Sequence, residues 1–144
     1  MLGESFSERG LRKHMKVKSF YDRVFETTVL FMMKTTPKEI DAYLIRHGYA
    51  EGTSGYGETK GSVTFLDQTD SKGRITREYL LIVEDKKDFY CLLHETHHLA
   101  THIMHDRGIP IRQDNDEVAA YIQNYWFRTL WRFMNNIKVT ERHI

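Results

Sequence analysis

The pentapeptide His94-Glu95-Thr96-His97-His98 combines side chains that can bind a metal with one that can move a proton. Residues four apart in a helix stand one above the other, so His94 and His98 are separated by about 6 Å along the axis and can converge on one ion. Zinc accepts imidazole nitrogens at roughly 2.0–2.1 Å. Glu95 follows the first ligand directly, where its carboxylate can accept a proton from a metal-bound water. The spacing predicts a catalytic-type zinc ion with Glu95 as general base.

The distribution of side chains around this predicted helix favours the metal hypothesis. At about 100° per residue, His94 and His98 fall on one side, and Leu92 and Leu99 fall on the other. A histidine of the core would instead lie within the apolar stripe. The simplest alternative is a solvated helix face that is rich in histidine. A structural zinc site is a further alternative, but such sites usually draw on cysteines, and the chain contains Cys91 alone.

A third ligand is expected, because catalytic zinc normally has three protein ligands and one open position. His102 and His105 share the ligand face, but His105 is about 10 Å further along the same straight helix than His98. Glu117 opens the next predicted helix, and the Gly-Ile-Pro break before it lets that helix fold back antiparallel against the first. We therefore expect Glu117 to complete the metal site with His94 and His98.

Other roles for these acidic residues stay open. Glu117 can instead cap its helix, where the helix dipole favours a carboxylate. Asp114 and Asp116 are the fallback ligands, and either can orient a ligand imidazole through a hydrogen bond.

The spacing of His94, His98 and Glu117, with eighteen residues between the second histidine and the glutamate, resembles the gluzincin arrangement of thermolysin-like proteases and zinc aminopeptidases. The stretch from Leu92 to about Trp131 is also similar to small zincin-like proteins encoded by bacteriophages. The resemblance implies a zincin-like fold, zinc held by these three residues and Glu95 as general base. The chain has no Gly-x-Met-Glu-Asn aminopeptidase signature, which leaves the substrate class open.

A small metalloendopeptidase acting on a peptide or protein substrate is the leading functional hypothesis. The tetrahedral intermediate needs a second stabilising group beside the metal, and Tyr121, His102 and His105 are the candidates, in that order. The strand at 77–83 is expected to border the cleft, where an exposed edge can pair with an extended peptide. One alternative is a catalytically silent zincin-like binding protein that keeps the metal. Another is a metal-dependent hydrolase of a non-peptide amide or ester.

The order of predicted elements gives an α+β class with a small mixed or antiparallel sheet. A Thr36-x-x-Glu39 capping box opens one helix and Gly48 closes it. Glycine-rich residues 50–61 are expected to form a loop, and Asp114 to start the last helix through a second capping box. The predicted strands cover 24–34, 62–66 and 75–83, and the other two helices cover 86–107 and 114–135.

The bulk composition describes a single domain over residues 1–144, with 1–18 as a possible N-terminal arm. A net charge of +1 gives no electrostatic footprint for nucleic acid. No apolar run approaches the length that spans a membrane. With one cysteine, a disulfide framework is excluded, so we expect a soluble, cytoplasmic protein. The sequence does not indicate an oligomeric state.

Overall fold

A four-stranded mixed sheet organises the α+β fold in the computed structural model, which describes residues 16–33, 35–49 and 61–137. The strand order is β1-β2-β4-β3, with β2 and β4 parallel and the other neighbours antiparallel. The strands are β1 (Lys16–Asp22), β2 (Thr27–Met33), β3 (Gly61–Thr69) and β4 (Ile75–Val83). The α+β class and the predicted β3–β4 hairpin are therefore confirmed. The glycine-rich segment expected to form a loop lies, apart from Gly61, outside the described residues.

Strand β1 corrects two sequence-based expectations. It begins within the segment predicted as an N-terminal arm, of which residues 1–15 lie outside the described part of the chain. The predicted strand from residue 24 starts only at Thr27, because the buried Asp22 carboxylate accepts hydrogen bonds from the backbone N–H groups of Val24 and Phe25. These bonds close a turn between β1 and β2, so local geometry overrides the strand propensity of Val24 and Phe25.

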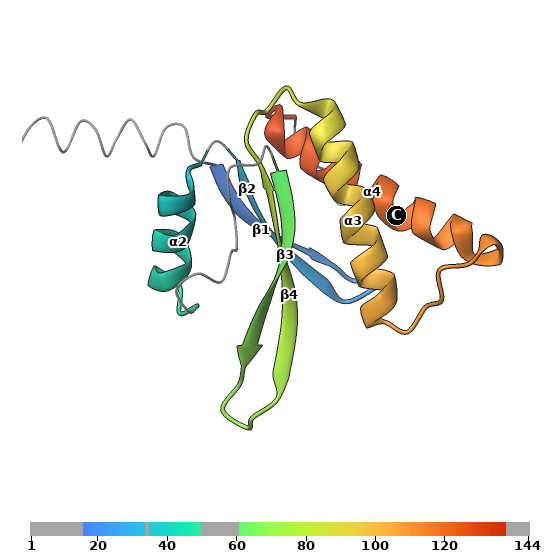
Figure 1. Ribbon diagram of the computed structural model, residues 1–144, viewed down its shortest axis with the longest axis horizontal. Helices are drawn as coiled ribbons and strands as arrows, with labels where there is room; N and C mark the ends of the chain where they lie inside the picture. The colour runs from blue at the N-terminus through green and yellow to red at the C-terminus, as the bar shows by residue number, and fades with distance from the viewer. Residues whose placement is uncertain (1–15, 34, 50–60, 138–144) are drawn as a thin grey trace, which may run out of the picture.

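Helix α2 (Pro37–Arg46) covers one face of the sheet (Figure 1). Its predicted capping box is confirmed: Glu39 N–H donates to the Thr36 hydroxyl at 3.3 Å, and Thr36 N–H donates to the Glu39 carboxylate at 3.2 Å. Gly48 follows the helix with φ +91°, a conformation that favours glycine. Ile40 and Leu44 are buried against the sheet in a small apolar layer.

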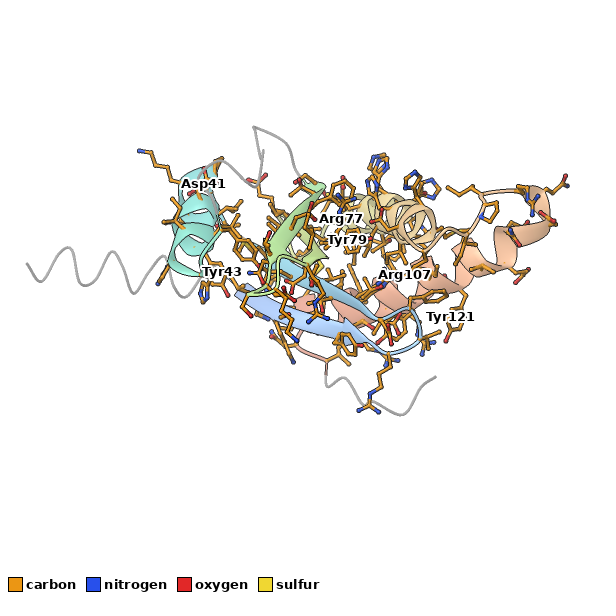
Figure 2. The ribbon with its side chains drawn as sticks, turned by 90° about the horizontal axis from the view of Figure 1, so that it is seen from below. Asp41, Tyr43, Arg77, Tyr79, Arg107 and Tyr121 are labelled. Atoms are coloured by element: carbon orange, nitrogen blue, oxygen red, sulfur yellow. The ribbon has the colours of Figure 1, made fainter. Side chains whose placement is uncertain are left out.

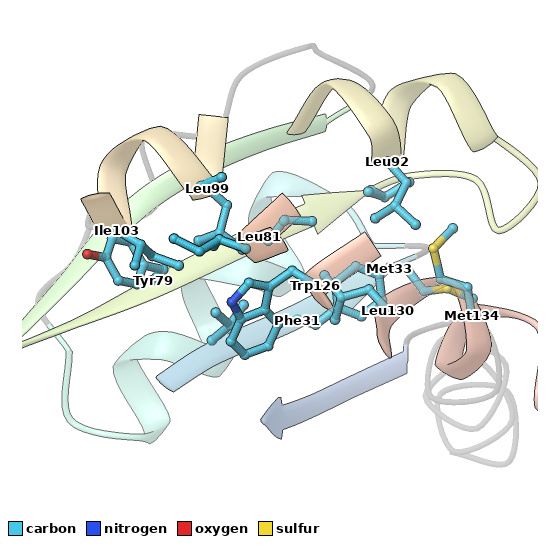
Figure 3. Close-up of a cluster of buried hydrophobic side chains, with 14 of the residues drawn as sticks. Phe31, Met33, Tyr79, Leu81, Leu92, Leu99, Ile103, Trp126, Leu130 and Met134 are labelled. Carbon is cyan, nitrogen blue, oxygen red and sulfur yellow. The ribbon is translucent and has the colours of Figure 1, made fainter. Parts of the chain in front are cut away.

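Helices α3 (Phe89–Asp106) and α4 (Asp116–Met134) cover the opposite face, and α4 crosses α3 at an angle (Figure 1). The predicted packing of the second helix against the first is therefore observed, and Gln123 of α4 hydrogen-bonds to the Leu93 carbonyl of α3. Their shared core with the sheet is drawn in Figure 3. Its members come from β2, β4 and both helices and include Phe31, Tyr79, Leu81, Leu92, Leu99, Ile103, Trp126 and Leu130. None of the described helices is long and apolar enough to cross a membrane.

The start of α4 also differs from the prediction. A short 3-10 turn, η1 (Gln113–Asn115), precedes the helix, and the residue at its N-cap, Asn115, makes no capping hydrogen bond with its side chain. The Asn115 amide instead donates to the Pro110 carbonyl at 3.0 Å. The predicted capping box between Asp114 and Glu117 is therefore not formed.

The packing of α3 gives a direct stability test. Leu99 is fully buried, so Leu99→Ala removes core contacts and leaves a cavity, which should lower the free energy of unfolding by about 2–5 kcal/mol. Leu93 on the same helix is 40% exposed, and Leu93→Ala should change it by only about 0.5 kcal/mol. Urea denaturation measures both values. Equal losses in the two variants would contradict the assignment of the buried face.

Candidate metal centre

Helix α3 carries the candidate site on the face opposite its core stripe. Leu92 and Leu99 are buried, whereas His94 and His98 are exposed. The Asp88 carboxylate accepts a hydrogen bond from Cys91 N–H at 2.9 Å and caps the start of the helix. The predicted helical context of the histidine motif is therefore confirmed.

The imidazoles of His94 and His98 converge. Their Nε2 atoms lie 3.0 Å apart, and the rings meet edge to face with an interplanar angle of 82°. Two nitrogens bound tetrahedrally to one zinc ion at 2.0–2.1 Å are about 3.4 Å apart. If the two Nε2 atoms moved apart by a few tenths of an ångström, they would have the spacing of two zinc ligands. The two side chains therefore fit a shared metal.

Glu95 lies beside this pair but is almost completely buried, with 7% of its surface exposed. Burial raises the pKa of its carboxyl group above the ordinary value, and positive charge on His98 and His94 opposes that rise. Among the described residues, Glu95 has no hydrogen bond or ion pair to its carboxylate. A carboxyl group with a raised pKa beside two histidines is a candidate for proton transfer.

Strand β3, and not β4, borders this side of α3. The sheet order places β4 between β2 and β3, so the predicted edge at residues 77–83 is wrong, and β3 is one of the two edge strands of the described sheet. Gly61 of β3 lies next to Glu95, and further along the strand the Phe65 ring meets the His102 ring at 4.9 Å. The edge of the sheet therefore follows the glutamate and histidine face of the helix.

The predicted third ligand is not brought to the pair. Within the described parts of the chain, no three His, Cys, Asp or Glu side chains gather where they could hold a metal ion. The face of α4 toward α3 is marked by Gln123, whose amide donates to the Leu93 carbonyl at 3.1 Å. Glu117 is exposed and lies about 120° around α4 from Gln123. The ligand set of His94, His98 and Glu117 is therefore not formed.

Tyr121 is also directed away from the histidines. It lies about 160° around α4 from Gln123, it is 46% exposed, and it projects from α4 on the side remote from α3 (Figure 2). His105 is one turn beyond the pair, with 85% of its side chain exposed, and its Nδ1 is 3.6 Å from the Asp106 carboxylate. The geometry favours neither as a stabiliser of a reaction at His94 and His98. Of the three candidates, His102 is the one that packs against β3.

A polar cluster at the C-terminal end of α3 was not predicted. Asp106 accepts hydrogen bonds from the Tyr79 hydroxyl and, at 3.3 Å, from Arg77. Arg77 also binds Asp67 at 2.9 and 3.1 Å and lies over the Phe65 ring at 4.2 Å. These contacts join the end of α3 to the β3–β4 hairpin. Its members come from β3, β4 and α3, which are distant in the sequence, so no local spacing indicates this cluster.

His102 provides a pH test of this packing. Burial against the strand lowers its pKa below the ordinary value of 6.5, although the nearby Asp106 carboxylate opposes the shift. The unfolded chain then binds the proton more tightly than the folded protein, so this residue destabilises the fold as pH falls through 6.5 toward the folded pKa. An NMR titration of the His102 ring should give a midpoint below 6.5. A midpoint at or above that value would contradict the burial.

The comparisons with known proteins do not support the expected family. No family model, no curated protein and no solved structure matches the chain. The predicted gluzincin identity, including the likeness to small phage proteins, is therefore wrong: its defining ligand set is absent from the described residues. The physical reason is the direction of α4, which presents Gln123 to α3 and turns Glu117 away.

Proposed function

We propose that the protein is a metal-dependent hydrolase in which His94 and His98 bind a zinc ion and Glu95 is the general base. The observation that carries this proposal is the pairing of two features on one turn of α3. Two imidazole nitrogens converge to 3.0 Å, and next to them lies Glu95, which has 7% of its surface exposed and a carboxyl group with a raised pKa. Water or a substrate oxygen would occupy the remaining positions around the ion.

Glu95 favours a hydrolase over a protein that only binds metal. A metal-holding helix needs the two histidines, whereas it does not need a carboxyl group whose pKa is raised by burial. A carboxyl group whose pKa is raised is a stronger base once ionised, and positive charge on His98 and His94 favours its ionised form. A role in proton transfer accounts for the raised pKa of Glu95 and its place beside the histidines.

The expected chemistry follows from these positions. Bound zinc would lower the pKa of its water and polarise a carbonyl group of the substrate. Glu95 would accept the proton of the attacking water and deliver it to the leaving group. We favour a peptide or protein substrate, because β3 is an edge strand that lies alongside this face of α3 and an edge can pair with an extended chain.

Metal binding is the first prediction of the proposal. His98→Ala leaves one imidazole and should lower zinc affinity by at least about tenfold, as measured by competition with a chelating dye. Glu117→Gln is the matched control: since Glu117 lies apart from the pair, its affinity should stay within about twofold of wild type. An equal loss of zinc affinity in both variants would contradict a site formed by two histidines. It would mean that Glu117 also binds the metal, which requires a different orientation of α4.

Proton transfer by Glu95 is the second prediction. Glu95→Gln keeps the size of the side chain and removes the base, so kcat should fall by about 10²–10⁴-fold while bound zinc is retained. Dye-quenched casein reports peptide hydrolysis, and 4-nitrophenyl acetate reports ester hydrolysis. Turnover of the ester alone would assign a non-peptide hydrolase. If the wild type binds zinc but hydrolyses neither probe, the protein only binds metal, and the proposal is contradicted.

A further inference from the structure

Strand β3 makes its closest approach to α3 at Gly61. A Cβ atom placed on Gly61 would be 2.5 Å from the Cys91 sulfur, 3.0 Å from the Ile82 carbonyl oxygen and 3.1 Å from the Glu95 Cγ atom. Atoms that are not bonded do not approach to 2.5 Å, so any side chain at this position displaces a neighbour. Glycine is therefore required here by a close approach, since Gly61 is not among the glycines with positive φ.

The strand cannot relieve this contact by moving away from the helix. Gly61 pairs with Val83 at the end of the β3–β4 ladder, and the Ile82 carbonyl belongs to the backbone of β4. A shift of β3 toward β4 would shorten a contact that is already tight, and a shift outward would break the pairing. A larger residue at position 61 would therefore push on the helix side, where Cys91 and Glu95 stand one turn apart.

These contacts restrict the side chain of Glu95. Its stem lies under the strand at Gly61, while positive charge on His98 and His94 acts on its carboxylate. Catalytic groups work well only when their rotamers are fixed by packing, because a displacement of about 1 Å can cost 10²-fold in rate. We propose that Gly61 is a positioning residue. Its missing side chain lets β3 approach Cys91 and Glu95 closely, and this contact holds the Glu95 carboxylate toward the His94–His98 pair. This inference rests on the proposed function.

Gly61→Ala tests the inference, because a positioning role affects kcat and leaves KM and zinc affinity unchanged. The added methyl group should displace the Glu95 side chain and lower kcat for dye-quenched casein at least tenfold. KM and zinc affinity should stay within about twofold, since both histidines are untouched. Ser62→Ala, on the neighbouring residue of the same strand, is the matched control and should keep the wild-type kcat.

The contact with Cys91 supplies a second comparison. In the Cys91→Ala background the 2.5 Å contact is absent, so the fold-loss of kcat caused by Gly61→Ala should be clearly smaller than in the wild-type background. If Gly61→Ala does not fold, Cys91→Leu enlarges the same contact from the helix side and should lower kcat in the same way.

The outcomes separate this inference from the proposed function. An active wild type whose Gly61→Ala variant keeps full kcat overturns the positioning role alone. The positioning role is also overturned if Gly61→Ala lowers kcat equally in the wild-type and Cys91→Ala backgrounds. It is overturned as well if Gly61→Ala lowers kcat and zinc affinity together. A wild type that binds zinc but hydrolyses neither casein nor the ester overturns the proposed function, and the positioning role with it.

Discussion

Helix α3 buries Leu92, Leu99 and Ile103 against the sheet, and this contact fixes the direction of every other side chain on the helix. With these residues inward, His94 and His98 must face solvent. Glu95 falls at the border between the two faces, where the edge strand β3 covers it. The orientation of the candidate centre is therefore set by apolar packing, and no additional element is needed to turn the histidines outward.

Both ends of α3 are attached to the rest of the fold. The Asp88 side chain caps the first turn, and Asp106 binds Tyr79 and Arg77 near the last one. Beyond the helix, the Arg107 side chain donates to the Phe25 carbonyl at 2.8 Å. Exposed ion pairs contribute little to stability, so these contacts chiefly fix register and direction. The turn with the histidines is held between them, as a preorganised site requires.

Sequence patterns located the helices well because their signals are local. The capping box at Thr36 and the division of α3 into an apolar and a histidine face depend on residues within a few turns. The failures involve contacts between distant segments. β1 depends on pairing with β2, and the direction of Glu117 depends on how α4 crosses α3, which no spacing along the chain determines. The burial of Glu95 likewise depends on Gly61, more than thirty residues earlier.

Anomalous diffraction at the zinc absorption edge, from crystals grown with zinc, tests the central claim most directly. The account predicts one strong peak within bonding distance of Nε2 of both His94 and His98, with the Glu95 carboxylate close enough to contact a water on the ion. A peak at other residues, or none at this pair when zinc is in excess, would contradict it. α3 would then be a histidine-rich helix without a metal centre.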